Sequence, residues 1–314
     1  MVSTEGQATP PEDDRGPGES VWESVESQVH EWEAQVREAN ERIDRAAGRP
    51  LWAAIVVGVS LGGLLLASVL IHPLIFSVVI AVLQVLAVWE LVSALRVTGA
   101  KLSRVGLGLL ALGVSAGAYL QGAQGLILGF GAALVVALMF RLAATVAPSY
   151  RDGLRTDMPQ GLLVLGYLGI LPATAIALAT TAQGPWWIIS VMIAVVAIDT
   201  TAYAVGRAMG RNKLAPAISP GKTWEGLAGA TLAGVAAGAA VGVWLLGIGA
   251  GWGVVFGLAM VVTATGGDLV ESLIKRELGL KDMSTLLPGH GGVLDRLDSA
   301  MPSVALAWVL SFLL

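Results

Sequence analysis

Gly267–Asp298 reads GDLVESLIKRELGLKDMSTLLPGHGGVLDRLD, and the rest of the chain is organised around it. This stretch holds ten acidic or basic side chains, one histidine and paired glycines, with long apolar segments before and after it. A charged side chain in the middle of a membrane helix costs about 2.5–3.5 kcal/mol on insertion scales, so such a residue is a functional-site hypothesis by default. If a helix continues through the start of the stretch, one face carries four polar side chains at i, i+3, i+4 and i+7: Asp268, Glu271, Ser272 and Lys275.

The polar positions of this stretch resemble the signature of the phosphatidate cytidylyltransferases, also called CDP-diacylglycerol synthases. The matching groups are Ser272-x-x-Lys275-Arg276, Lys281-Asp282, Pro288-Gly289-His290-Gly291-Gly292 and Asp295-Arg296-x-Asp298. With two further motifs, the resemblance covers about the last 120 residues, whereas the first 180 match only in being hydrophobic. It implies a membrane enzyme that uses CTP and phosphatidate.

Composition predicts a membrane protein. Of the 314 residues, 55% are hydrophobic and 13% charged, which excludes an ordinary soluble domain. The chain has no cysteine, so disulfides, thiolate catalysis and cysteine-ligated metals are excluded. No nucleic-acid partner is expected.

We expect nine apolar spans in an all-α, polytopic fold. They lie at about 51–71, 74–95, 104–121, 124–147, 160–182, 185–207, 224–247, 250–275 and 299–314. All 19 Lys and Arg residues fall before the first span or in and around alternate connections. The positive-inside rule then places the N-terminus in the cytoplasm and the C-terminus outside, in a bacterial-type inner membrane. The charged loops, and with them the active site, face the cytoplasm.

The regions outside the spans are expected to differ in order. Residues 1–20 are predicted to be a disordered acidic tail. Residues 21–47 carry a heptad stripe, which predicts either a coiled coil between protomers or an amphipathic helix on the membrane. Residues 51–183 form the N-terminal transmembrane helices, and 184–314 the catalytic transmembrane region.

Asp268 and Asp295 are the candidate metal ligands. A nucleotide polyanion that approaches a second phosphate needs a divalent cation, and Mg²⁺ is usually held by one or two carboxylates together with substrate phosphates. The resemblance implies Mg²⁺ here, with a second, monovalent cation beside it. The alternative is that both aspartates only form ion pairs with the neighbouring bases.

Two motifs extend the resemblance toward the N-terminus. Asp199 lies in IDTTAYAVGR and is either a cavity-lining carboxylate or a hydrogen-bond partner between helices. Ser219–Glu225 (SPGKTWE) is not a P-loop, because Pro216 occupies the position of the first glycine and no strand is expected before it. It still offers Lys222 to a phosphate at a helix N-terminus, although a plain positive-inside loop is the alternative.

The resemblance gives the site residues by motif position. The catalytic candidates are Asp268, Asp295, Lys275 and Asp199. The substrate-binding candidates are Ser219, Lys222, Ser272, Arg276, Lys281, Asp282, His290, Arg296 and Asp298. Glu90 and His72 match no motif and are interpreted as structural.

The expected reaction transfers the cytidylyl group of CTP to phosphatidate, giving CDP-diacylglycerol and pyrophosphate. Two alternatives stay open, namely a CTP-dependent kinase of polyprenol or phytol type and an ion-coupled transporter. The spacing of Gly234, Gly238 and Gly242 predicts a close-packed helix face, which serves either the protomer core or a homodimer.

Overall fold

The computed structural model describes residues 51–144, 154–280, 283–284 and 292–314. The predicted acidic tail (1–20) and heptad helix (21–47) lie outside the described residues. The chain forms two units, Met1–Ile55 and Val56–Leu314. The contacts described below all lie within the second unit.

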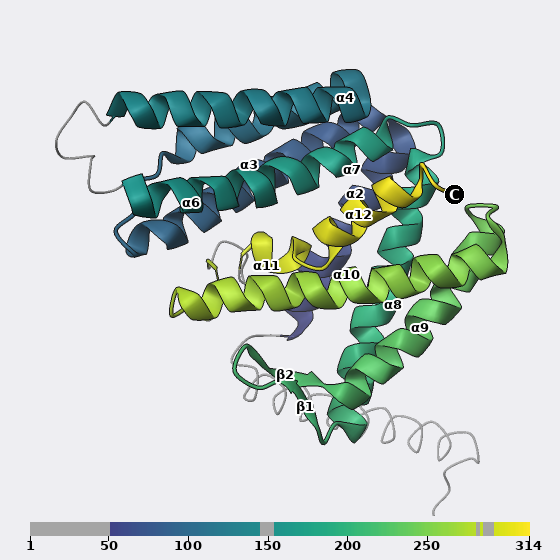
Figure 1. Ribbon diagram of the computed structural model, residues 1–314. Helices are drawn as coiled ribbons and strands as arrows, with labels where there is room; N and C mark the ends of the chain where they lie inside the picture. Colours follow the sequence, from purple (N-terminus) through teal and green to yellow (C-terminus); the bar gives the residue numbers. More distant parts are fainter. Residues whose placement is uncertain (1–50, 145–153, 281–282, 285–291) are drawn as a thin grey trace, which may run out of the picture. The chain divides into compact units, whose positions relative to one another are not determined.

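Helices make up nearly all of the described chain, which confirms the all-α membrane fold (Figure 1). They are α2 (Leu51–Ile71), α3 (Pro73–Val97), α4 (Arg104–Ala144), α6 (Leu154–Val164), the π-helical turn η1 (Leu165–Ile170), α7 (Leu171–Ala179), α8 (Gly184–Met209), α9 (Trp224–Trp244), α10 (Gly249–Glu277), α11 (Leu294–Leu297) and α12 (Ala300–Leu310). Among the described residues, six helices are long and apolar enough to cross a membrane, with α6, η1 and α7 counted as one. The apolar parts of α2 and α12 are shorter.

The longest helix, α4, is bent back on itself. Gly122 at the bend has φ 57° and ψ −131°, a left-handed conformation that suits glycine. A Cβ on Gly117 would overlap the carbonyl oxygen of Gly125, and one on Gly129 would lie 3.1 Å from the Cα of Val114. Residues at matching distances on either side of the bend therefore face each other, so α4 is an antiparallel pair of helices, as the predicted break between 121 and 124 requires.

Glycines on α9 and α10 bring these two helices into backbone contact. A Cβ on Gly238 would overlap the carbonyl oxygen of Gly253, and one on Gly257 would overlap that of Gly234. A Cβ on Gly242 would come within 2.6 Å of the Cα of Gly253. Of the two uses that the sequence leaves open for this glycine face, the structure shows packing inside the protomer.

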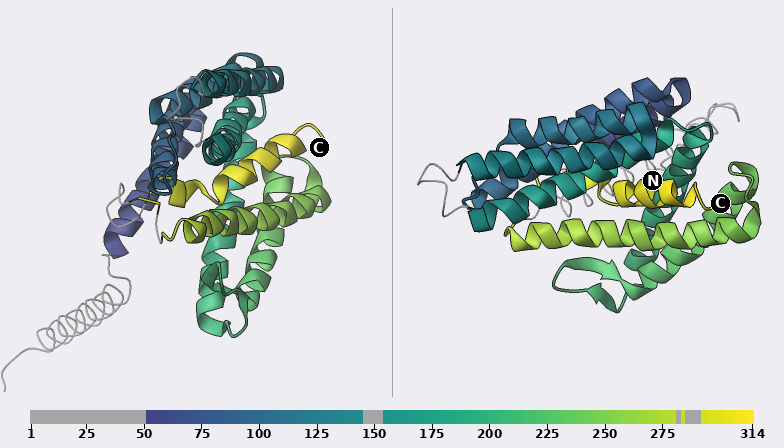
Figure 2. Two further views of the ribbon diagram at one scale, coloured as in Figure 1. Left: turned by 60° about the vertical axis from the view of Figure 1, so that its left-hand side comes forward. Right: turned by 45° about the horizontal axis from the view of Figure 1, so that its top comes forward.

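Three local features were not predicted. A two-stranded antiparallel hairpin joins β1 (Lys213–Ala215) to β2 (Ser219–Thr223), between α8 and α9. The span expected at 160–182 contains the π-helical turn η1. The span expected at 299–314 is the shorter helix α12, preceded by the separate turn α11, and α12 lies against α10 in both views of Figure 2.

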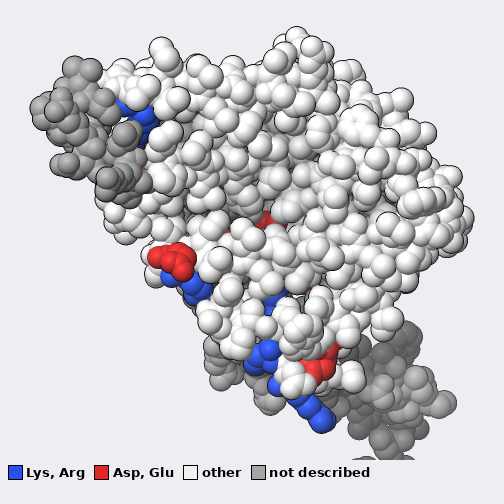
Figure 3. Space-filling model, viewed as in Figure 1, with Lys and Arg blue, Asp and Glu red and all other residues white. Residues whose placement is uncertain are grey.

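Charged side chains occupy few places on the face of the molecule shown in Figure 3. On the face shown in Figure 3, Lys, Arg, Asp and Glu gather near the C-terminal end of α10 and around the β1–β2 hairpin, and most of the remaining surface is uncharged. The exposed apolar residues on this protein include Val262 and Leu232, which are 71% and 74% exposed. Such a surface is suited to contact with lipid.

Candidate active site

The polar face of α10 forms as its spacing predicts, because the helix continues to Glu277. The Ser272 hydroxyl donates a hydrogen bond to Asp268 Oδ1 at 3.2 Å. One turn on, Lys275 Nζ pairs with Glu271 Oε2 at 2.5 Å and with Asp295 Oδ1 at 2.9 Å. Glu271 is fully buried, so Lys275 joins a buried acid on its own helix to an acid on α11.

The β1–β2 hairpin brings Lys222 to the same helix. Lys222 Nζ lies 2.7 Å from Asp268 Oδ2. Thr223, the last residue of β2, caps α9 by accepting a hydrogen bond from the Gly226 amide at 3.1 Å. This cap fixes the end of the strand, which holds Lys222 over α10.

A second tether connects the hairpin to the C-terminal end of α10. Arg276 Nε donates a hydrogen bond to the carbonyl oxygen of Ile218 at 3.2 Å, and Arg276 Nη1 donates to that of Leu280 at 3.3 Å. Ser219, the next residue of the hairpin, is half-buried at the start of β2. Two predicted substrate-binding residues, Ser219 and Arg276, are therefore held near each other.

Asp295 is strongly anchored. Its Oδ2 accepts hydrogen bonds from the Gly292 amide at 2.7 Å and the Met283 amide at 3.2 Å, while Oδ1 pairs with Lys275. Burial acts to raise the pKa of Asp295, but the hydrogen bonds that it receives outweigh burial and hold the pKa below its usual value. The carboxylate is therefore ionised and rigidly oriented.

Asp298 stands beside Asp268. Its side chain accepts a hydrogen bond from the Ser299 amide at 2.7 Å, and its backbone carbonyl packs so closely on Gly267 that a Cβ there would overlap it. Burial, followed by the negative charge of Asp268, raises the pKa of Asp298 to about 7, with Asp199 contributing in the same direction. Three acids thus act on one another, with Lys222 paired to one of them.

This acidic group is chemically suited to a hard cation. Carboxylate oxygens are the ligands that Mg²⁺ prefers. After burial, the charges of Asp268 and Asp199 both act to raise the pKa of Asp298. Within the described residues, however, no three Asp, Glu or His side chains stand together as a complete metal site. Asp268 and Asp295 each pair with a different lysine, Lys222 and Lys275 respectively. The donor type fits Mg²⁺, and substrate phosphates would have to supply further ligands.

An apolar cavity of about 280 Å³ reaches this region. Its walls come from α2, α3, α7, α8 and α12, and include Leu61, Leu83 and Val191. Its two charged lining residues are Asp199 and Arg296. Two of the predicted site residues therefore stand at the edge of a space that is otherwise suited to hydrocarbon.

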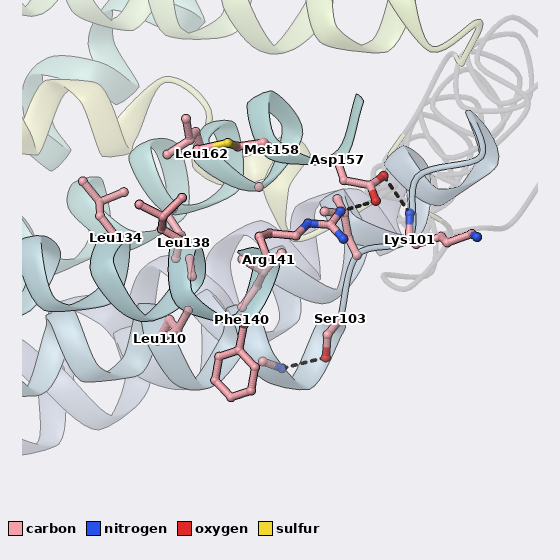
Figure 4. Close-up of a pocket in the computed structure, with 16 residues that line it drawn as sticks. Lys101, Ser103, Leu110, Leu134, Leu138, Phe140, Arg141, Asp157, Met158 and Leu162 are labelled. Carbon is pink, nitrogen blue, oxygen red and sulfur yellow. Dashed lines mark hydrogen bonds and ion pairs between the residues drawn. The ribbon is translucent and has the colours of Figure 1, made fainter. Parts of the chain in front are cut away.

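A second cavity, of about 270 Å³, lies between α4 and α6 (Figure 4). Leucine is the commonest residue in its lining, and one end is polar. There Arg141 pairs with Asp157, whose Oδ1 accepts a hydrogen bond from the Lys101 amide at 2.9 Å. None of the predicted site residues lines this cavity. Its polar end instead ties α6, through Asp157, to Arg141 near the end of α4 and to Lys101 in the connection that precedes α4.

Not every predicted site residue can be placed, and two acids outside the predicted set contact the site residues or their segment. Lys281, Asp282 and His290 lie outside the described residues. Glu271 shares the predicted face of α10 but was not selected as a site residue. Glu90, interpreted as structural, is buried in α3 and contacts the segment that carries Asp295. The sequence feature that could have singled out Glu90 is its position as a lone acid inside an apolar span.

Comparisons with known proteins identify the family of this chain. The family model described as "Cytidylyltransferase family" matches residues 52–314. The chain belongs to the cytidylyltransferase family. The phosphatidate cytidylyltransferase of Mycobacterium bovis is 37% identical over 280 residues, which cover 85% of this chain and 90% of the relative. That of Mycobacterium leprae is 36% identical over 294 residues, covering 89% and 93% of the two chains.

Another cytidylyltransferase matches a shorter part of the chain at higher identity. The phosphatidate cytidylyltransferase of Brucella abortus is 49% identical over 112 residues, or 35% of this chain and 41% of the relative. The family match, by contrast, includes α2 to α12. The family match therefore includes the N-terminal helices, in which the sequence shows no motif with recognisable chemistry.

Proposed function

We propose that this chain transfers the cytidylyl group of CTP to phosphatidate, giving CDP-diacylglycerol and pyrophosphate for phospholipid synthesis. The main support is the 37% identity to a phosphatidate cytidylyltransferase over 85% of the chain. The clustering of Lys222, Asp268, Lys275 and Asp295 supports it independently. In this reaction a phosphatidate oxygen forms a bond to the α-phosphorus of CTP, and the bond to the pyrophosphate oxygen breaks.

The residues of the cluster are suited to a reaction without a deep general base. A phosphomonoester is already a competent nucleophile, so positioning and charge neutralisation are what the protein must provide. Lys222 lies at the N-terminus of α9, where a phosphate is favoured. We infer that Lys222 exchanges its pairing with Asp268 for a CTP phosphate, while Arg276 and Ser219 contact the nucleotide from the hairpin side.

Asp268 and Asp295 are the proposed ligands for Mg²⁺. When bound, the ion would neutralise charge on the triphosphate and on the leaving pyrophosphate. Lys275 orients Asp295 through the ion pair at 2.9 Å. A second, monovalent cation remains a prediction of the family resemblance.

The apolar cavity is the proposed binding site for an acyl chain of the lipid substrate. A phosphatidate acyl chain entering the space among α2, α3 and α8 would leave its phosphate near Arg296, at the charged edge of the cavity. Asp199 lies at the same edge, where it would orient the headgroup or the cation. The enzyme then takes CTP from the aqueous side and lipid from the bilayer.

We further propose nine membrane spans, with the N-terminus and the active site on the cytoplasmic side of a bacterial-type inner membrane and the C-terminus outside. The two arms of α4 and the short apolar helices α2 and α12 support this number. The distribution of all 19 Lys and Arg residues supports the orientation. The division at 183/184 and a homodimer remain predictions, and the α9 glycine face gives the homodimer no support.

The decisive experiment incubates purified protein in detergent with phosphatidate, α-labelled CTP and Mg²⁺, beside a sample with chelator. We expect label in the lipid fraction and pyrophosphate release only when Mg²⁺ is present. Transfer from γ-labelled CTP, with CDP as the product, would instead indicate a lipid kinase. If neither label reaches lipid with any cation, both the cytidylyltransferase and the lipid kinase are rejected. Transport would then be assayed in vesicles.

A further inference from the structure

Glu90 on α3 makes the longest-range polar contacts to the active-site segment. Its side chain is 3% exposed. Its Oε1 accepts hydrogen bonds from the Ser284 hydroxyl at 2.6 Å and the Val293 amide at 2.9 Å, and its Oε2 accepts one from the Leu294 amide at 3.0 Å. These donors are 194 to 204 residues further along the chain.

The same short segment also supplies Asp295. Three consecutive amides are divided between two carboxylates: that of Gly292 binds Asp295, and those of Val293 and Leu294 bind Glu90. The direction in which the Asp295 side chain points is therefore set by a turn whose backbone is held from α3. Glu90 takes three donors on its two oxygens, two of them backbone amides of this turn, so it is a firm anchor.

Gly292 fits between the two carboxylates because it has no side chain. A Cβ at this position would lie 2.6 Å from Glu90 Oε2 and 3.0 Å from its Cδ, both closer than a Cβ normally approaches. Any larger residue must push the turn away from α3 or rotate Glu90. The position thus provides a second, independent means of disturbing the same contact.

We propose that Glu90 is a positioning residue for the cytidylyl transfer, which holds the Gly292–Leu294 turn so that Asp295 meets Lys275 and the substrate phosphates. It acts through Asp295 and does not contact substrate. The inference rests on the proposed function for its catalytic consequence, whereas the contact itself is a property of the fold. The competing explanation is that Glu90 is only a core anchor.

Asp157 provides a matched control for that explanation. Like Glu90, it is a carboxylate with almost no exposure, at 2%, and it holds a connecting segment through the Lys101 amide. It also pairs with Arg141, at the polar end of the cavity in Figure 4. Asp157→Asn therefore removes a buried anchoring charge from the N-terminal helices without touching the Gly292–Leu294 turn.

The test compares full-length wild type, Glu90→Gln, Glu90→Asp, Gly292→Ala and Asp157→Asn, each in detergent. Measurements are the melting temperature, kcat and KM for CTP, the Mg²⁺ concentration that gives half-maximal rate, and hydrogen exchange of the Gly292–Leu294 amides. We expect Glu90→Gln and Gly292→Ala to lower kcat at least ten-fold, to raise the Mg²⁺ requirement several-fold, and to speed amide exchange. Glu90→Asp should recover part of the loss, and Asp157→Asn should keep kcat within two-fold whatever its melting temperature.

Two results would overturn the proposal: a Glu90→Gln enzyme with wild-type kcat and Mg²⁺ dependence, or an equal loss of kcat in Asp157→Asn. If Glu90→Gln does not fold, Glu90→Asp and Gly292→Ala decide the matter by the same criteria. If the wild type itself makes no CDP-diacylglycerol, the proposed function fails. Hydrogen exchange of the Gly292–Leu294 amides then tests separately whether Glu90 anchors the turn. Unchanged exchange in both Glu90→Gln and Gly292→Ala would reject this anchoring.

Discussion

Replacing Lys275 by methionine should destabilise the fold as well as stop catalysis. Lys275 is 12% exposed and neutralises two acids, Glu271 and Asp295, which are 0% and 6% exposed. Removing one partner of a buried ion pair costs about 3–5 kcal/mol, because the remaining charge stays buried without compensation. Asp295 keeps its two amide donors, whereas Glu271 loses its cation, so most of the cost arises at Glu271.

A matched lysine allows the magnitude to be checked. Lys222 also pairs with an aspartate, but these side chains are 23% and 34% exposed, and such pairs contribute at most about 1 kcal/mol. Unfolding in detergent, followed by tryptophan fluorescence, should therefore separate Lys275→Met from Lys222→Met by about 2–4 kcal/mol. Adding Glu271→Gln to Lys275→Met should restore part of the lost stability. Equal stabilities for the two single variants would refute the reasoning from burial.

Further substitutions test the site, the packing and the lipid cavity. Asp268→Asn and Asp295→Asn should each abolish lipid labelling while the protein stays folded by fluorescence, and full activity in Asp295→Asn would remove the metal-site proposal. Gly257→Ala should lower the melting temperature, because its Cβ would overlap a carbonyl oxygen of α9, whereas Gly251→Ala has open space and should not; equal effects would contradict the packing argument. Gly62→Leu would project into the apolar cavity and should reduce kcat/KM for long-chain phosphatidate more than for short-chain. Unchanged chain-length preference would argue against acyl binding there.

Local patterns in the sequence predicted the parts of this protein that depend on neighbours in the chain. The face from Asp268 to Lys275 follows from helical spacing alone, and the break in α4 near Gly122 follows from the end of an apolar run. The β1–β2 hairpin was not predicted, and Ser219–Thr223 was expected only as a loop. Strands of three and five residues, the second containing proline and glycine, have no detectable alternation.

What could not be predicted depends on contacts between distant segments. Nothing in the spacing of residues indicates that Lys222 pairs with Asp268 and Lys275 with Asp295. Glu90 is the clearest case, because its partners are supplied by tertiary packing of α3 on α11. A single acid inside an apolar span indicates that the acid has a structural or functional role, but it does not indicate which residues it contacts.

The contact between Glu90 and the Leu294 amide also affects the order of events during biosynthesis. The two residues are 204 positions apart, so at about 5–20 residues per second the ribosome needs roughly 10–40 s to supply the partners of an acid already made. During that interval α3 carries a carboxylate that is unfavourable in hydrocarbon. A nascent chain that stops before Val293 lacks both amides, so the protein should mature only after its last helices are released into the membrane. A truncated chain would then be recognised by quality-control proteases as a protein whose helices are incompletely inserted.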